Sequence, residues 1–357
     1  MPQPKSLYFA VPGDLHALTG GYGYDRRIIA GLREGGMHVD ILHLSGEFPF
    51  PAETTLAATA ALFAALPDGA QVIVDGLAFG VLDDLAVKEA RRLHLIALCH
   101  HPLALETGLD QTQAAALHLS EERALAAARS VIVTSASTSR LLLQEFSVPQ
   151  EKILLAPPGV TVSPEALSPG QSPARIPVLL TVATLTRRKG HDVLLDALAQ
   201  IRHLEWSARF VGGADFDPDW AAWLRAETHR LGLDERVHFV GNVADPAPEF
   251  ARAHVFVLPS RYEGYGMAFA EALAFGLPVV GARTGAVPDL VTGDAGILVA
   301  PDDSAALADA LARLLTDERL HSSLRQGARC VAQTLPTWQQ SVDQIARLLE
   351  QSQARSA

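Results

Sequence analysis

The sequence predicts an α/β protein with two doubly wound, Rossmann-like domains in tandem. Short apolar runs alternate with helical patterns almost throughout the 357 residues. Such strands, separated by helices, are typical of a parallel sheet covered by helices on both faces. The chain is also too long for one ordinary core and long enough for two. A segment rich in proline, glycine and serine around residue 165 indicates where the first domain ends.

The first half is expected to hold six strands and four main helices. The strands are the apolar runs at residues 7–11, 38–42, 71–75, 93–99, 131–134 and 153–156. The helices are the amphipathic or alanine-rich segments at residues 24–34, 53–66, 83–92 and 113–128. A segment dense in proline, glycine and serine, between residues 157 and 173, then predicts an exposed linker.

The alternation restarts after this linker. Six further strands are expected at residues 178–183, 208–211, 237–240, 255–258, 279–282 and 297–299. Helical patterns follow at residues 191–201, 220–231, 267–275 and 305–315, with a last helix at 338–351 after Pro336.

Composition excludes several classes of protein. The net charge of −11 argues against a nucleic-acid partner, because phosphate binding needs a basic surface. Two distant cysteines, Cys99 and Cys330, offer no disulfide framework and no zinc spacing. We find neither a signal peptide nor an apolar run that approaches the roughly 20 residues of a membrane span. A cytoplasmic protein without a transmembrane segment is therefore expected.

Two motifs of the first half lie where doubly wound sheets bind ligands, beyond the carboxyl ends of strands. Gly20 and Gly21 precede a helix and allow close approach of a ligand, although a plain loop explains them equally well. His100 and His101 end a strand, where imidazoles can donate to a sugar hydroxyl or move a proton. We favour a functional role for one of them over a packed core position. A metal is disfavoured, because no third ligand follows at a compatible local spacing.

Arg187, Arg188 and Lys189 stand between a strand and a helix of the second half. A solvated charge run is the usual explanation of such a cluster. Cations at the start of a helix oppose its dipole, however, and a bound phosphate offsets that cost. We therefore expect a phosphate site. Asp215 and Asp217, by contrast, precede Pro218 at an expected helix start and are interpreted as capping residues.

The segment SRYEGYGMAFAE, residues 260–271, carries the strongest signal. Gly264 and Gly266 allow a tight turn after a strand, and a helix whose N-terminus can hold a phosphate follows. Glu263 precedes that point and Glu271 lies about one turn inside the helix. A carboxylate can accept hydrogen bonds from the vicinal hydroxyls of a sugar ring. One glutamate on each side of a phosphate-binding turn therefore fits a nucleotide sugar.

These motifs together resemble glycosyltransferase family 4, a family of retaining enzymes. The resemblance covers nearly the whole chain and rests on motifs in the family's order: Gly20-Gly21, His100-His101, Arg188-Lys189-Gly190, the E-x7-E pair Glu263 and Glu271, and EGYGMAFAEALAFGLPVV. It implies the GT-B fold, with two facing Rossmann-like domains and a carboxyl-terminal crossover helix. Residues 1–165 would be the acceptor-binding domain, with the helix at 337–353 packed back on it. Residues 174–336 would be the donor-binding domain.

The resemblance also implies roles for individual residues. Lys189, helped by Arg188, would hold the donor diphosphate, and Glu263 would lie beside the transferred sugar. Glu271 would bind the ribose diol, and His100 or His101 would contact the transferred sugar. Backbone groups would complete the donor site. Sugar and phosphate would be bound by Gly264, Tyr265, Gly266 and Met267, and the base would be bordered by Gly241, Asn242 and Val243. The phosphate or the acceptor would be approached by Gly20 and Gly21.

One position departs from the family. Thr184 stands where many members have an arginine, so Arg187 or Arg188 would supply that charge.

The implied reaction moves a sugar from a UDP-, GDP- or ADP-linked donor to a hydroxyl of a sugar, glycan or lipid-linked acceptor. The anomeric configuration is kept, and no metal is required if the cations stabilise the leaving diphosphate. A peripheral membrane contact stays open, although no Lys/Arg-rich amphipathic helix supports it. The alternatives are a nucleotide-sugar 2-epimerase, a sugar phosphorylase and a non-catalytic binding module of the same fold.

Overall fold

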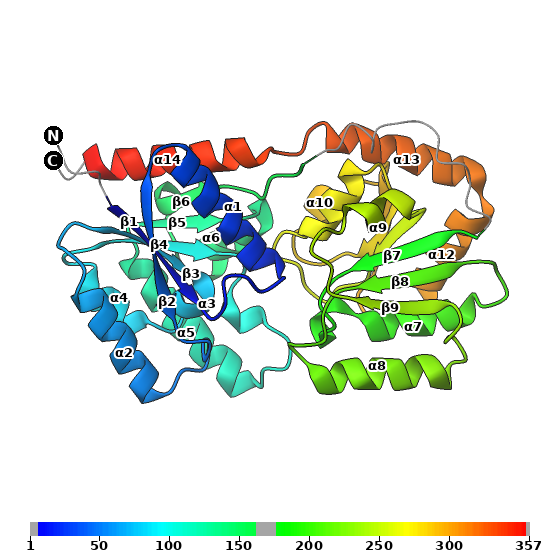
Figure 1. The fold of residues 1–357 in the computed structure, drawn as a ribbon, viewed down its shortest axis with the longest axis horizontal. Coiled ribbons are helices and arrows are strands. Elements are labelled where there is room, and N and C mark those ends of the chain that lie inside the picture. The colour runs from blue at the N-terminus through cyan, green and yellow to red at the C-terminus, as the bar shows by residue number, and fades with distance from the viewer. Residues whose placement is uncertain (1–5, 162–175, 355–357) are drawn as a thin grey trace. The chain divides into compact units, whose positions relative to one another are not determined.

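The computed structural model describes residues 6–161 and 176–354. The chain forms two compact units. Unit 1 combines residues 1–159 with residues 336–357, and unit 2 spans residues 160–335 (Figure 1). Most of the predicted linker, residues 162–173, and the predicted boundary residues 165 and 174 lie outside the described residues.

Unit 1 contains a six-stranded parallel sheet in the order β2-β1-β3-β4-β5-β6. Its strands are β1 (Ser6–Pro12), β2 (His38–Leu44), β3 (Gln71–Asp75), β4 (His94–Cys99), β5 (Ser130–Val133) and β6 (Ile153–Leu155). All residues of β3 and β5 are buried, as expected for strands covered on both faces.

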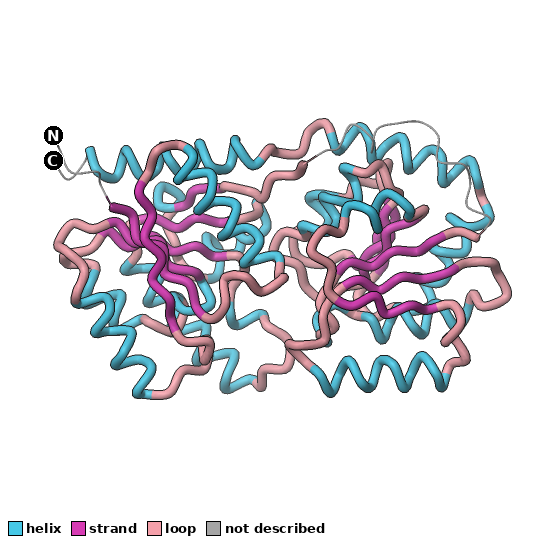
Figure 2. The backbone as a smooth tube through the Cα atoms, in the orientation of Figure 1, coloured by secondary structure: helices cyan, strands magenta, loops and turns pink. Residues whose placement is uncertain are grey.

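Helices flank both faces of this sheet (Figure 2). They are α1 (Gly20–Glu34), α2 (Glu53–Ala64), α3 (Gly76–Phe79), α4 (Asp83–Glu89), α5 (Gln111–Ala127), α6 (Ala136–Glu145) and α14 (Trp338–Ala354), with short 3-10 turns at η1 (Leu103–Leu105) and η2 (Gln150–Lys152). The carboxyl-terminal α14 packs on α1, where a side chain at Gly31 would collide with Val342.

Unit 2 contains a second six-stranded parallel sheet, in the order β12-β11-β10-β7-β8-β9. Its strands are β7 (Val178–Val182), β8 (Ser207–Val211), β9 (Val237–Gly241), β10 (Val255–Leu258), β11 (Val279–Ala282) and β12 (Gly296–Val299). Its helices are η4 (Arg187–Lys189), α7 (His191–Gln200), α8 (Pro218–Arg230), α9 (Ala247–Arg252), α10 (Met267–Ala274), α11 (Val287–Leu290), α12 (Ser304–Thr316) and α13 (Glu318–Ala332).

The predicted α/β class with two Rossmann-like sheets is confirmed, and all twelve predicted strands are present. Two helical predictions need correction. Gly20 and Gly21 are the first two residues of α1 rather than a loop before it, because the Thr19 side chain caps the helix there. Helix α13, which begins at Glu318 shortly after α12 ends at Thr316, was not among the predicted helices, although its sequence is strongly amphipathic.

No helix within residues 6–161 and 176–354 is long and apolar enough to cross a membrane.

Candidate active site

Unit 2 has a topological switch point between β7 and β10. From β7 the chain moves outward through β8 and β9, whereas from β10 it moves outward on the other side through β11 and β12. The loops that leave these two strands therefore diverge at the carboxyl edge of the sheet, where doubly wound sheets bind their ligands. The two strongest predicted motifs, at residues 187–190 and 260–271, lie in these two connections.

Gly190 brings the two loops into contact. Its φ of +69° is a left-handed conformation that favours glycine. A Cβ atom added at Gly190 would lie 2.1 Å from the carbonyl oxygen of Pro259. The N–H of Arg261 donates to the carbonyl of Arg188 at 2.8 Å. The segment that carries Lys189 is therefore fixed against the segment that carries Glu263.

Lys189 and Glu263 form a largely buried ion pair at this edge. The Nζ atom of Lys189 lies 2.7 Å from Oε1 of Glu263, and the hydroxyl of Ser260 donates to the same oxygen at 2.6 Å. Burial alone would raise the pKa of Glu263. The charges of Lys189 and Arg188, with the two hydrogen bonds, outweigh burial and lower that pKa below its ordinary value. Glu263 is therefore a carboxylate that holds Lys189 in place.

The two arginines beside Lys189 have different surroundings. The guanidinium of Arg188 donates to the carbonyl of Tyr262 at 3.1 Å, and its charge acts on Glu263. The guanidinium of Arg187 lies over the ring of Trp220, 4.3 Å from its centroid. Arg188 is therefore the arginine held next to the ion pair. Thr184 lies two residues after β7, in the same connection.

Helix α10 begins at the end of the segment that carries Glu263. Its N-cap is Gly266, with a φ of +95°, and no side chain of the described residues caps it. The N–H groups of its first turn therefore point at a position that suits an anion. Gly264 and Tyr265 are buried, and Met267 and Glu271 are half-buried.

Gly241, Asn242 and Val243 follow at the end of β9. The amide nitrogen of Asn242 donates to Asp215 at 3.2 Å. Asp217 caps α8 by accepting from the N–H of Trp220 at 3.1 Å, as predicted. The D-x-D pair is therefore held by contacts within unit 2.

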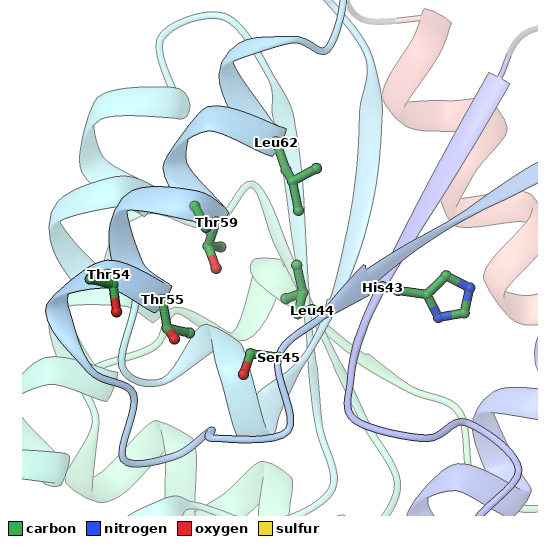
Figure 3. Close-up of a pocket in the computed structure, with 8 residues that line it drawn as sticks. His43, Leu44, Ser45, Thr54, Thr55, Thr59 and Leu62 are labelled. Atoms are coloured by element: carbon green, nitrogen blue, oxygen red, sulfur yellow. The ribbon is translucent and has the colours of Figure 1, made fainter.

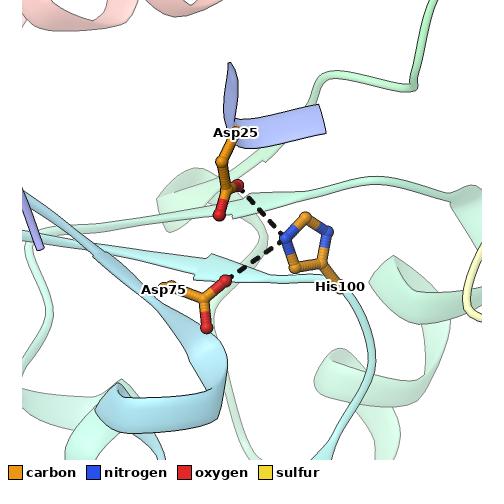
Figure 4. Close-up of side chains that lie close together, drawn as sticks. All are labelled: Asp25, Asp75 and His100. Carbon is orange, nitrogen blue, oxygen red and sulfur yellow. Dashed lines mark ion pairs between the residues drawn. The ribbon is translucent and has the colours of Figure 1, made fainter. Parts of the chain in front are cut away.

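A second cluster lies at the carboxyl edge of the unit 1 sheet, whose switch point falls between β1 and β3. The Nε2 atom of His100 lies 3.3 Å from Oδ1 of Asp25 and 3.4 Å from Oδ2 of Asp75 (Figure 4). A Cβ atom added at Gly21 would lie 3.5 Å from the same imidazole. The structure therefore brings the predicted Gly21 and His100 together, whereas Gly20 lies in the same first turn of α1.

Sequence reasoning missed both carboxylates of this cluster. Asp75 is the last residue of an apolar strand, so the strand-end criterion that selected His100 would also have found it. Asp25 lies inside α1, and no local signal distinguishes it from a surface residue. The three side chains also offer one metal-ligand atom each, all within 4.8 Å of one another. Local spacing did not reveal this group, because its members come from three different elements.

His101 has different partners from His100. Its Nε2 atom lies 3.2 Å from Oε2 of Glu106, a carboxylate that is 41% exposed. Neighbouring residues at a strand end point to opposite sides, which explains why the two histidines separate.

Unit 1 also has a pocket of about 240 Å³ at the carboxyl end of β2, which the sequence did not predict. Hydroxyl and apolar side chains of the β2 end and of α2 line it (Figure 3). Its lining residues include Leu44, Ser45, Thr55, Thr59 and Leu62.

Comparison with known proteins identifies what the second half of the chain is similar to. The family model described as "Glycosyl transferases group 1" matches residues 176–317, which contain Lys189, Glu263 and Glu271. Residues 176–317 are therefore similar to the glycosyl transferases group 1 domain. D-inositol 3-phosphate glycosyltransferase 1 of Catenulispora acidiphila is 32% identical over 266 residues, 68% of this chain and 62% of that protein. The chain spans little more than half the length of the curated relatives it matches.

Solved structures show the fold of the chain. Sucrose-phosphate synthase from Thermosynechococcus elongatus matches 98% of this chain and 100% of its own, with a TM-score of 0.82 and 24% identity. The Anabaena protein HepE, solved with UDP and glucose, matches 96% of this chain and 99% of its own, with a TM-score of 0.77 and 22% identity. The expected GT-B class is therefore confirmed.

Proposed function

We propose that the chain is a retaining glycosyltransferase that moves a sugar from a nucleoside diphosphate to an acceptor hydroxyl. The observation that carries this proposal is the Lys189–Glu263 ion pair at the switch point of unit 2, 2.7 Å between Nζ and Oε1. The pair lies next to the segment that leads into α10, whose N-terminus no side chain of the described residues caps. Both features attract a diphosphate, and the loops that carry them lie at the ligand edge of a doubly wound sheet.

In the proposed reaction the bond between the anomeric carbon and the β-phosphate oxygen breaks. The acceptor hydroxyl oxygen forms a new bond to the same carbon on the same face, and its proton passes to the departing β-phosphate. Lys189, Arg188 and the first turn of α10 stabilise the negative charge that develops on the diphosphate. These groups need no change of protonation during the reaction.

Glu263 acts through its charge in this proposal. Its Oε1 atom already accepts from Lys189 and Ser260, and its pKa is lowered, so it is neither a free nucleophile nor a proton donor. A carboxylate there favours the positive charge that develops on the transferred sugar. Glu271, one turn inside α10, binds the ribose hydroxyls, and Gly241, Asn242 and Val243 border the base.

The role proposed for unit 1 follows the family resemblance. Residues at the carboxyl edge of its sheet bind the hydroxyl-bearing acceptor, and His100 donates to a sugar hydroxyl. The two cysteines are free, which fits a reducing compartment such as the cytoplasm.

The relatives support a transferase over an isomerase or a binding module. The curated matches are named as glycosyltransferases and as mannosylfructose-phosphate synthase. The structural match HepE is described in complex with UDP-glucose. We therefore place UDP-sugars first among the candidate donors, followed by GDP- and ADP-sugars.

A thermal-shift screen with UDP, GDP, ADP and their hexose conjugates tests donor binding. A ligand at 100 times its Kd stabilises the folded state by about 2.7 kcal/mol, so one nucleotide series should raise the Tm clearly above the others. Lys189→Met should abolish that rise. No shift with any nucleotide, at millimolar concentration and with or without a divalent cation, overturns the proposal.

A turnover assay with the selected donor then separates the reaction classes. Release of nucleoside diphosphate that increases with an added sugar or lipid-linked acceptor, with the product keeping the donor's anomeric configuration, is expected. Conversion of the donor sugar to its 2-epimer without acceptor identifies an isomerase instead. Binding without turnover over the full acceptor panel identifies a binding module.

A further inference from the structure

Two buried carboxylates converge on one nitrogen of His100. Asp25 comes from α1, Asp75 ends β3, and His100 follows β4, so the chain brings them together from three elements. Both carboxylates face Nε2, at 3.3 and 3.4 Å. Figure 4 shows the other ring nitrogen, Nδ1, turned away from both of them.

Burial makes this arrangement costly unless its charges are compensated. Asp25 is 0% exposed, and neither of its oxygens accepts a hydrogen bond from the described residues. A carboxylate in that position needs a cation or a proton. The imidazole of His100 is in contact with it, and the carboxyl group of Asp75 is also close enough to act on it.

Part of the His100 imidazole is also exposed to solvent. Nε2 is fully buried, and the Gly21 backbone lies over the edge formed by Nε2 and Cδ2. The side chain of His100 is nevertheless 21% exposed. Its accessible surface therefore lies away from the carboxylates.

We propose that Asp25 and Asp75 are positioning residues that share the Nε2–H of His100 and fix the ring as a cation that presents Nδ1–H to a hydroxyl oxygen of the sugar substrate. The identity of that substrate rests on the proposed function. The role of the carboxylates does not, because it concerns the protonation and orientation of the ring. In this arrangement His100 is a permanent donor and not a base, since both ring nitrogens carry protons.

The electrostatics of the cluster agree with its geometry. Burial alone would lower the pKa of His100, but the close approach and the charges of Asp25 and Asp75 raise it to about 10. Burial raises the pKa of Asp25 to about 7, against the opposing effect of His100. The imidazole therefore stays charged near neutral pH.

Tyr22, Tyr24 and Cys99 near the cluster stay neutral. Burial, followed by the charges of Asp75, Asp25 and Asp14, raises the pKa of Tyr22 to about 12, and burial and Asp25 raise that of Tyr24. Burial, then Glu121 and Asp75, raises the pKa of Cys99.

A proton fits this cluster better than a metal ion. The described residues supply three ligand atoms, one fewer than a tetrahedral site needs, and Nε2 is shielded from the solvent that would provide the fourth. The proton also explains why both carboxylates approach the same ring nitrogen rather than a common point outside the ring.

Ring-15N NMR of the full chain, labelled at histidine, tests this inference without any sugar nucleotide. Loss of one set of signals in His100→Gln assigns the residue. We expect both nitrogens of His100 to stay protonated up to at least pH 8 in the wild-type protein. Asp75→Asn should lower its titration midpoint by about one unit or more, because the nearby opposite charge is lost.

Asp75→Asn is the informative variant because it should fold. Oδ1 of Asp75 caps α3 by accepting from the N–H of Leu77 at 2.8 Å, and asparagine caps equally well. Glu106→Gln is the matched control, since it removes the carboxylate beside His101 and should leave His100 unchanged.

Three results overturn the inference. They are a wild-type His100 midpoint near 6.5, an unchanged midpoint in Asp75→Asn, and an unprotonated Nε2 whose signal moves on addition of EDTA or Zn²⁺. The last result assigns a cation site instead. If the nucleotide screen fails while His100 stays protonated, the proposed function falls and this inference stands.

A kinetic readout applies once a donor is known. Asp75→Asn should lower kcat at least tenfold above pH 7 with little change in the donor KM, and the loss should shrink at pH 6, where the ring regains its proton. A loss that is equal at both pH values means that Asp75 has only a structural role.

Discussion

Lys189 and Glu263 are 74 positions apart in the chain, and their side chains meet with 2.7 Å between Nζ and Oε1. The pair joins the loops that leave β7 and β10, the two strands at the switch point of unit 2. Each partner compensates the burial of the other, so either one left alone would be an uncompensated charge.

Lys189→Met should therefore have two separable effects. It should cut kcat by about 100-fold or more, because one preorganised charge on the leaving group is lost. It should also destabilise the protein by about 3 kcal/mol, because Glu263 stays buried without its cation. Steady-state kinetics and chemical denaturation measure the two effects.

The double variant Lys189→Met/Glu263→Gln is the control for this prediction. It should regain most of the stability and none of the activity, whereas Lys88→Met, at a side chain 71% exposed, should change neither. Wild-type turnover in Lys189→Met would remove this residue from the site.

Glu271→Ala should weaken nucleotide binding more than it slows turnover. Glu271 lies one turn inside α10 and is half-buried, and the proposed function assigns its carboxylate to the ribose hydroxyls and not to the departing phosphate. We expect Kd for the nucleoside diphosphate to rise by about tenfold, the loss of one charged hydrogen bond, in isothermal titration. Glu318→Ala, an exposed acid at the start of α13, should leave Kd unchanged. Equal Kd values for both variants contradict the assignment.

Gly190→Ala should destabilise unit 2 and disturb Lys189 at the same time. Gly232 provides a matched control, because its φ of +67° is close to the +69° of Gly190 and nothing lies within 4 Å of an added Cβ atom. Gly232→Ala should cost about 1 kcal/mol, the strain of a left-handed alanine. Gly190→Ala should cost more, since its methyl group meets the Pro259 carbonyl at 2.1 Å. Thermal denaturation compares the two variants. Equal losses of stability would show that the contact between Gly190 and Pro259 does not contribute to the stability of unit 2.

Glu121→Gln should flatten the pH dependence of stability. Burial raises the pKa of Glu121 to about 8, against the hydrogen bond that its Oε2 accepts from Leu103 at 2.8 Å. Between about pH 5 and 8 the folded state therefore keeps a proton that the unfolded chain has lost, so this group makes stability fall as pH rises. The glutamine keeps the acceptor and removes the titration.

Calorimetry at pH 5, 6, 7 and 8 tests this sign. The Tm of Glu121→Gln minus the Tm of the wild type should increase by several degrees from pH 5 to pH 8. Glu122→Gln, at the neighbouring position, should follow the wild type. Parallel curves for the wild type and Glu121→Gln would falsify the prediction.

The sequence was most informative where one strand or one loop carries the whole signal. Strands such as β3 and β10 are buried on both faces, so their apolar runs are visible without knowledge of their neighbours. The motif around Glu263 was found for a related reason, since the turn, the acid and the following helix are contiguous.

Relationships between distant elements were not visible in the same way. The Asp25–His100 contact depends on how α1 packs over the end of β4, which no local pattern records. The contact of Lys189 with Glu263 likewise follows from the pairing of β7 with β10, strands that are far apart in sequence. The pocket beside β2 combines a strand end with one side of α2, so its lining is not a motif either.

The position of α14 has a consequence for how the chain is made. Val342, Ile345 and Leu349 of this helix are buried within unit 1, and the Leu349 carbonyl accepts from the side chain of Gln71 at 2.8 Å. Most of unit 1 precedes unit 2 in the sequence. Helix α14, which covers part of unit 1, leaves the ribosome only after all of unit 2 has been synthesised. During translation, the apolar surface of unit 1 that α14 covers is therefore exposed while unit 2 is being synthesised.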